Sequence, residues 1–327
     1  MISIITPTHK MTPLLDLTIK SVICQEYTDW EWVVLDNSED FYFGNYLEGF
    51  FERNPRFNLD GIRKKIKIIN RHYPADTPIG RFKNDLVDLT SCKDSEYVML
   101  LDHDDLLDCC ALAEIHKMDN RYPNAQFISG DCLVMHYEND KWFMFNMDIT
   151  FGKDMLNRQC CIVEDVTDDE GIWIDDFELR FGRIANAKSR YIHPFPCCGD
   201  ENPKHIKLQM HPRCIKRWCF DIEAFRFYEG VRYAEDVTQL MFLGMCAKGV
   251  YIPKTVYYYV FYGDRSNATY SLVEHNNDSD MRVLYSGADV MTRIFQQTYP
   301  DYTYMDKFIN KHELKNYERI KEMHKKK

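Results

Sequence analysis

The stretch YVMLLDHDDLLD, residues 97–108, joins a run of apolar residues directly to an acidic cluster. The apolar part, from Tyr97 to Leu101, has the length and composition of a strand that is buried on both faces. Asp102, Asp104 and Asp105 follow within four positions, where their like charges repel one another. At the carboxyl end of a parallel strand, these side chains would lie in the crevice where such sheets bind ligands.

Short apolar or β-branched runs alternate with helical patterns over the first hundred residues. The spacing predicts helices around Leu15–Ile23 and Phe82–Leu89. Strands that alternate with helices indicate an α/β fold, with a Rossmann-like, mostly parallel central sheet and helices on both faces. The predicted strands are residues 2–6, 31–36, 65–70 and 96–102.

The chain beyond Asp108 has a different organisation. We expect a helix within residues 106–118, two strands joined at 138–140, and a helix that starts near Glu235 and ends near Gly249. Residues 148–220 have no clear period and are predicted to form an irregular insertion. Residues 266–327 are predicted to form a C-terminal helical extension.

Composition restricts the class of protein. The 327 residues, 45% of them hydrophobic, can bury a sizeable core. The chain has no uncharged apolar run near the 18 residues of a membrane span and no basic leader, so we expect a cytoplasmic protein without a transmembrane segment. Twelve cysteines in a chain of this length, partly as adjacent pairs, are expected to be reduced. The net charge of −10 argues against nonspecific nucleic-acid binding by the whole surface.

The acidic cluster has two interpretations. Adjacent carboxylates at a strand end are stable when Mg²⁺ or Mn²⁺ neutralises them, and these ions commonly bring substrate phosphates. Alternatively, Asp102 simply ends the strand, while Asp104 and Asp105 cap a helix that starts near Leu106. The cluster by itself leaves both interpretations open.

Four stretches, in order and spacing, resemble the nucleotide-sugar glycosyltransferases of family 2, which have the GT-A fold. They are SIITPTHK, SVICQEYTDWEWVVLDNSED, GRFKNDLVDLTSCKDSEYVMLLDHDDLLD and YAEDVTQLMFLGMCAKG. The resemblance implies one GT-A domain over residues 1–265. Its nucleotide-binding half would be residues 1–108, and its acceptor half, with the insertion, residues 109–265.

The resemblance also implies roles for particular residues. Asp36 would contact the base of the donor, which is a UDP-sugar by analogy, and Asp102 would contact its ribose. Asp102 and Asp104 would chelate the Mn²⁺ or Mg²⁺ that bridges the diphosphate. Asp236, which follows Glu235, would be the base that activates the acceptor hydroxyl, unless this pair only caps its helix. The remaining donor-site candidates are Pro7, Thr8, His9, His103, Lys83 and Asn84.

The implied activity is a metal-dependent, inverting transfer of a hexosyl or N-acetylhexosaminyl group to a hydroxyl acceptor. Three departures from the family pattern bear on it: Lys10 replaces Asn, Leu35 replaces the first of two Asp residues, and Leu240 or Met241 replaces Arg. A nucleotide-sugar-binding or assembly protein without turnover is therefore the main alternative. A metal-dependent nucleotidyl- or phosphotransferase would share the carboxylates.

Residues 178–217 carry nine basic side chains against three acidic ones. Arg183, Arg190, Lys207 and Arg213 are predicted to grip phosphates of an acceptor, which we expect to be a glycan or lipid-linked sugar rather than a nucleic acid. A solvated loop is the alternative. The cysteines and histidines of this segment lack the close spacing of a zinc site. The basic C-terminal end is more typical of a solvated helix than of a peripheral membrane contact.

Overall fold

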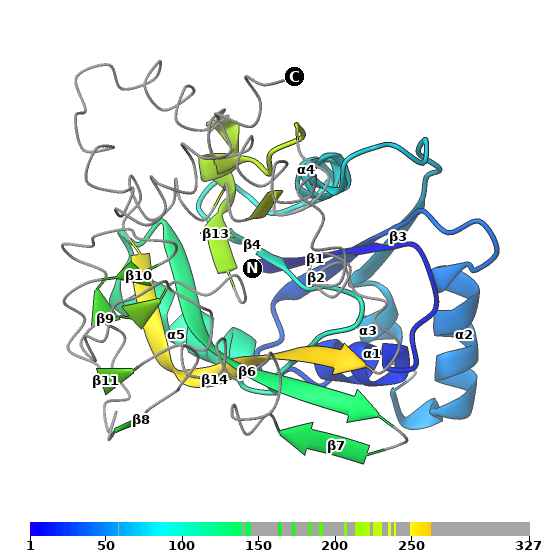
Figure 1. Ribbon diagram of the computed structural model, residues 1–327, viewed down its shortest axis with the longest axis horizontal. Coiled ribbons are helices and arrows are strands. Elements are labelled where there is room, and N and C mark those ends of the chain that lie inside the picture. The colour runs from blue at the N-terminus through cyan, green and yellow to red at the C-terminus, as the bar shows by residue number, and fades with distance from the viewer. Residues whose placement is uncertain are drawn as a thin grey trace, which may run out of the picture.

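The architecture was analysed in a computed structural model of the chain (Figure 1). The structure describes residues 1–57, 59–138, 141–144, 163–164, 172–173, 183–184, 190–191, 206–207, 213–222, 225–230, 235–236, 239 and 249–262. The predicted C-terminal extension and most of the predicted insertion lie outside these residues. So do most positions of the helix expected after Glu235, although Glu235, Asp236 and Gln239 are helical.

A ten-stranded sheet is the centre of the described fold. Its order is β3-β2-β1-β4-β13-β6-β14-β5, with β7 added to β6 and β9 added to β14. The first four strands are parallel to one another, and the antiparallel pairs lie on the other side of β4. The predicted α/β class with a mostly parallel central sheet is confirmed. The first four strands are β1 (Ile2–Thr8), β2 (Trp30–Asp36), β3 (Ile66–Asn70) and β4 (Tyr97–Leu100).

Helices cover both faces of the parallel strands. Every residue of β1 and β2 is buried, which explains their apolar composition. Figure 1 shows α4 (Ile79–Leu89) on the opposite side of the sheet from α1 (Leu15–Ile23). The other helices are α2 (Phe43–Arg53), α3 (Asp60–Arg63), α5 (Ala111–Arg121) and the 3₁₀ turns η1 (Pro55–Phe57) and η2 (Arg217–Asp221).

Helix α2 was not predicted, although its sequence contains the signal. Phe43, Leu47, Phe50 and Phe51 recur at helical spacing and are buried. The side chain of Asp36, at the end of β2, accepts a 2.7 Å hydrogen bond from the backbone N–H of Phe43. This contact ties the start of α2 to the sheet.

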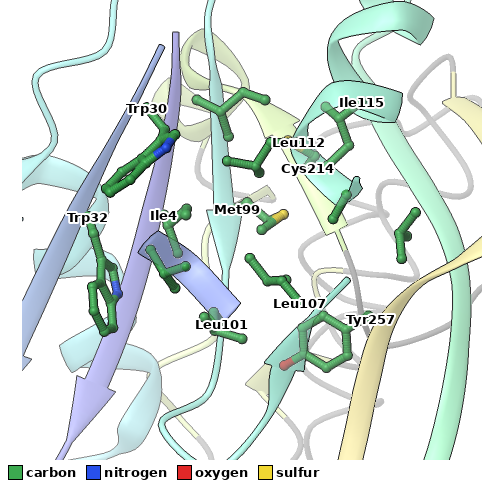
Figure 2. Packing of buried hydrophobic residues seen from close by; sticks show 14 of the residues in the cluster. Ile4, Trp30, Trp32, Met99, Leu101, Leu107, Leu112, Ile115, Cys214 and Tyr257 are labelled. Carbon is green, nitrogen blue, oxygen red and sulfur yellow. The ribbon is translucent and has the colours of Figure 1, made fainter. Parts of the chain in front are cut away.

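One hydrophobic core joins the two halves of the sheet (Figure 2). Ile4, Trp32 and Met99 from the parallel strands pack in the same buried cluster as Cys214 and Tyr257 from the mixed part. The long strands β6 (Phe127–Glu138) and β14 (Gly249–Tyr262) run parallel to each other. They belong to the same sheet as the parallel strands.

The end of the predicted insertion belongs to the central sheet. Residues Arg213–Lys216 form β13, which lies between β4 and β6 and is antiparallel to both. The predicted strand pair around 138–140 is observed as β6 and β7 (Lys141–Met144). Two-residue strands are described elsewhere in the insertion: β8 (Val163–Glu164), β9 (Ile172–Trp173), β10 (Arg183–Ile184), β11 (Arg190–Tyr191) and β12 (Ile206–Lys207).

The interpretation of Asp104 and Asp105 as helix caps is wrong. The chain after β4 turns into the short strand β5 (Leu106–Leu107), and α5 begins only at Ala111. Asp105 instead accepts hydrogen bonds from the Tyr257 hydroxyl, at 2.7 Å, and from the backbone N–H of Val260, at 2.8 Å. Its carboxyl group therefore holds β14 beside the end of β4.

Two expectations from composition can be compared with the described residues. Their cysteines, which include the adjacent pair Cys109 and Cys110, form no disulfide. In this part of the chain, no helix combines the length and the apolar composition that crossing a bilayer requires.

Replacing Asp105 by Asn should destabilise the fold. The amide keeps one acceptor oxygen, so one of the two donors, Tyr257 or Val260, loses its buried partner. An unsatisfied buried group costs about 1–3 kcal/mol, and denaturant unfolding should show a decrease of that size in the free energy of unfolding. Asp40→Asn, at an exposed position, is the matched control. Equal stability of the two variants would contradict the assignment.

Candidate functional site

The carboxyl ends of β1, β2 and β4 lie side by side at one edge of the sheet. Thr8 is in register with Asp36, and Ile5 is in register with Leu100. The backbone N–H of Leu101 donates to the carbonyl of Ile5 at 3.0 Å, so the chain stays beside β1 until it reaches Asp102. The predicted donor-site segments, 7–9, 36 and 102–104, are thus brought to one edge.

Asp36 lies at this edge of the sheet, at the carboxyl end of β2. It is 2% exposed. One carboxylate oxygen accepts hydrogen bonds from the backbone N–H and the hydroxyl of Ser38, and the other accepts from Phe43. The carboxylate therefore already stabilises the loop between β2 and α2. Recognition of a base by Asp36 stays a prediction.

His103 packs between the ends of β1 and β4. Its ring lies 5.4 Å from that of His9, edge to face, and its backbone carbonyl accepts a hydrogen bond from the Thr18 hydroxyl. Burial lowers the pKa of His103 to about 4, so its ring is neutral near pH 7. Its Nε2 atom has no hydrogen-bond partner among the described residues.

Asp102 and Asp104 are the partly buried carboxylates of this motif. Burial raises the pKa of Asp104 to about 7, and the charge of Asp102 adds to the effect, whereas Lys10 opposes it. The backbone N–H of Asp102 donates to the Tyr257 hydroxyl at 3.4 Å. The carboxylates of Asp102 and Asp104 therefore lie close enough to repel each other, and a cation would relieve their repulsion.

The described residues contain no group of three or more Asp, Glu, His or Cys side chains arranged to hold a metal ion. The pair of carboxylates of Asp102 and Asp104 nevertheless fits Mg²⁺ or Mn²⁺. Such ions are often held by one or two carboxylates together with the phosphates of a substrate. Asp102 and Asp104 would supply the protein's part of such a set.

Lys83 connects helix α4 with the Glu235 segment. Its ammonium lies 2.5 Å from Oε1 of Glu235, and each of the two side chains is 5% exposed. Burial by itself would lower the pKa of Lys83, but the charges of Glu235, Asp102 and Asp236 outweigh this effect and raise it. Residues from three distant parts of the sequence therefore form one cluster around this ammonium.

Asn84, predicted to contact the donor, is engaged with the protein backbone. Its Oδ1 accepts from the N–H of Phe227 at 3.0 Å, and its Nδ2 donates to the carbonyl of Phe227 at 2.8 Å. The same Nδ2 donates to Glu229 at 2.8 Å. Asn84 thus holds the segment that leads to Glu235.

Arg213 belongs to this site and not to a surface patch. It is 2% exposed, and its guanidinium donates to the Asp236 carbonyl at 2.7 Å and to Asp236 Oδ2 at 3.3 Å. The prediction that Arg213 grips acceptor phosphates is wrong, because the side chain is buried against Asp236. The side chains of Arg183, Arg190 and Lys207 lie outside the described residues.

Topology explains why the sequence did not reveal this role of Arg213. Strand β13 is antiparallel to β4, with Cys214 paired with Met99. The first residue of β13 therefore lies beside the carboxyl end of β4, where Asp102 follows. In the sequence, Arg213 follows Pro212 in a segment without clear periodicity. This local pattern does not predict a strand in the central sheet.

No family model matches the chain. The uncharacterized protein y4gI of Sinorhizobium fredii is 30% identical over 210 residues, which cover 59% of this chain and 21% of that protein. The chain thus spans about a fifth of the length of this curated relative.

Two solved structures were compared. S. aureus TarS 1–349 in complex with UDP has a TM-score of 0.48 at 14% identity, covering 95% of this chain and 75% of that one. The mannosyltransferase PcManGT from Pyrobaculum calidifontis, in complex with GDP-Man and Mn²⁺, has a TM-score of 0.48 at 12% identity, covering 88% and 63%.

Gly80 allows α4 to approach the Glu235 segment. A Cβ atom at this position would lie 2.5 Å from the carbonyl oxygen of Tyr228 and 3.4 Å from Cβ of Glu235. Gly80→Ala should lower the free energy of unfolding by about 1–3 kcal/mol, because the backbone must shift to relieve the overlap. Gly61→Ala is the matched control, since a Cβ there meets nothing within 4 Å. Thermal unfolding should separate the two variants, and equal stability would show that α4 does not contact this segment so closely.

Proposed function

We propose that the chain is a metal-dependent, inverting glycosyltransferase. It would transfer a hexosyl or N-acetylhexosaminyl group from a nucleotide-sugar donor, a UDP-sugar, to a hydroxyl group of an acceptor. The carrying observation is that the Asp102 motif, Lys83 and the Glu235–Asp236 pair form one charged cluster at the carboxyl edge of the sheet. Lys83 and Glu235 are 152 positions apart in the sequence, and burial of both charges is stable only because they pair with each other.

The donor half of the site would be formed by residues 1–108. Pro7 and Thr8 end β1 and His9 follows it, and Asp102 and Asp104 follow the end of the neighbouring strand β4. A bound Mn²⁺ or Mg²⁺ would stabilise the negative charge that develops on the departing diphosphate. Asp102 and Asp104 would hold it, and the Lys83 ammonium nearby would add positive charge to the same region.

The transfer step needs a base across the sugar from the leaving group. Asp236 would take the proton of the acceptor hydroxyl while the acceptor oxygen forms a bond to the anomeric carbon. The bond between that carbon and the diphosphate oxygen breaks in the same displacement, and the nucleoside diphosphate leaves with the electron pair. Attack from the face opposite to the leaving group inverts the anomeric centre.

Residues 109–265 would form the acceptor half, which contains the insertion. The basic residues of the insertion other than Arg213 suit a phosphate-bearing glycan or a lipid-linked sugar. The net charge of −10 would repel a long nucleic-acid duplex, which makes such an acceptor less favoured.

A nucleotide-sugar-binding protein without turnover is the second candidate. The observation in its favour is that Glu235 and Asp236 are both paired with basic side chains, Lys83 and Arg213. A carboxylate whose charge is partly neutralised is a weaker base. Turnover of a donor in the presence of Mn²⁺ decides between the two functions.

Asp104→Asn tests the donor and metal site. In the parent, a UDP-sugar should raise the melting temperature only with Mn²⁺ or Mg²⁺ present, because a ligand that binds the native state stabilises it by mass action. The variant keeps the size of the side chain but loses its charge, so the ligand-induced shift should largely disappear. Asp40→Asn, at an exposed position, should behave like the parent. An unchanged metal-dependent shift in Asp104→Asn would exclude Asp104 as a ligand, and the absence of any shift in the parent would count against the function.

Asp236→Asn tests the base. The amide cannot accept a proton, so turnover should fall by about 10²-fold or more, the usual contribution of a positioned base. Donor binding, measured by the same melting-temperature shift, should be nearly unchanged because the donor site is formed by other strand ends. Unimpaired turnover would assign the base elsewhere, whereas a variant that no longer folds would show that Asp236 is mainly a structural partner of Arg213.

A further inference from the structure

The guanidinium of Arg213 contacts two different groups of a single residue. Nη1 donates to the backbone carbonyl of Asp236 at 2.7 Å, and Nη2 lies 3.3 Å from Oδ2 of its carboxylate. A contact to both groups fixes the side-chain torsion between them, since the carboxylate cannot rotate without leaving the guanidinium. The direction of the other carboxylate oxygen is thereby determined as well.

The guanidinium is itself held in place. Nη1 also lies 3.5 Å from Oε1 of Gln239, whose Nε2 donates to the carbonyl of Phe225 at 2.7 Å. Arg213 and Gln239 are 2% and 0% exposed. A buried charge of this kind is stable only with partners in good geometry. The hydrogen bonds from Phe225 through Gln239 to Arg213 therefore hold the guanidinium in a fixed position.

We propose that Arg213 is a positioning residue of the transfer reaction, which aims the carboxylate of Asp236 at the acceptor hydroxyl. The inference depends on the proposed function and adds a residue to it. Arg213 touches no substrate in this proposal and acts only through Asp236.

The charged groups around Asp236 allow the proposal to be tested by the pH dependence of kcat. Asp236 is faced by Arg213 from β13 and lies in a cluster with Lys83 of α4, Asp102 after β4 and Glu235 of its own helix. The closest positive charge favours the ionised form of a carboxylate, so its removal should move ionisation to higher pH. A lysine would keep the charge, but a single ammonium cannot reproduce the fork that reaches both the carbonyl and the carboxylate.

The experiment compares Arg213→Lys and Arg213→Met with Arg217→Met as the matched control. Arg217 is a partly exposed neighbour that pairs with Asp221 on the surface, so its loss removes the same charge away from the site. UDP release from UDP-glucose and UDP-N-acetylglucosamine with Mn²⁺ is measured against pH, with water as the acceptor. Donor KM and melting temperature are recorded for each variant.

We expect Arg213→Lys to lower kcat about 10-fold or more while donor KM and the acid limb of the kcat profile stay near those of the parent. Arg213→Met should lower kcat further and move the acid limb up by about one pH unit or more. Arg217→Met should match the parent. A purely structural role would lower the melting temperature of the Arg213 variants but leave kcat of the folded protein and its acid limb unchanged, and this result would overturn the proposal. If Arg213→Met does not fold, Arg213→Lys decides by itself.

A double-mutant cycle separates this inference from the proposed function. Asp236→Asn and Arg213→Met are combined, and the losses of melting temperature are compared. Because each single change leaves a buried partner unpaired, the combined loss should be smaller than the sum of the single losses. Additive losses would overturn the contact on which the inference rests. Non-additive losses in a protein whose parent turns over no donor would confirm the contact but refute the catalytic role, together with the proposed function.

Discussion

The buried ion pair between Lys83 and Glu235 is the constraint on which the site depends. Each side chain is 5% exposed, and neither charge would be tolerated there without the other. Lys83 belongs to α4, which packs on the parallel strands, whereas Glu235 belongs to the segment that follows β13. The pair therefore joins the two halves of the fold near Asp102, which follows β4. Two other residues of α4 help to join these halves. Asn84 binds the backbone of Phe227, and Gly80 allows α4 to approach Tyr228 closely.

A second buried acid, Asp105, fixes the other side of the same edge. Its hydrogen bonds to Tyr257 and Val260 hold β14 next to the end of β4. The residues of the acidic motif thus have different roles. Asp105 is structural, whereas Asp102 and Asp104 are partly buried at the edge. This division resolves the question raised by three closely spaced like charges. The carboxyl group of Asp105 stabilises the fold, and the carboxylates of Asp102 and Asp104 would bind the cation that we propose.

Much of the parallel half of the fold could be predicted from the sequence, because its signals are local. β1, β2 and β4 are runs of apolar residues, and α1 and α4 carry apolar residues at helical spacing. Helix α2 was missed although Phe43, Leu47 and Phe50 show the same spacing. The helix-cap interpretation of Asp104 and Asp105 failed because capping depends on where the next helix begins, and β5 intervenes before Ala111.

The sequence by itself determined the α/β class and the strand ends that carry polar residues. Its resemblance to a known family predicted that Lys83-Asn84, Asp102 and Glu235-Asp236 belong to one site. Only the tertiary structure decided what these residues touch. Arg213 lies beside Asp236 because β13 inserts antiparallel to β4, a long-range pairing for which four residues in irregular sequence give no local signal. Asp36 and Asn84 likewise proved to bind the backbone of the protein. Hydrogen bonds between segments distant in the chain depend on packing, which period and composition do not encode.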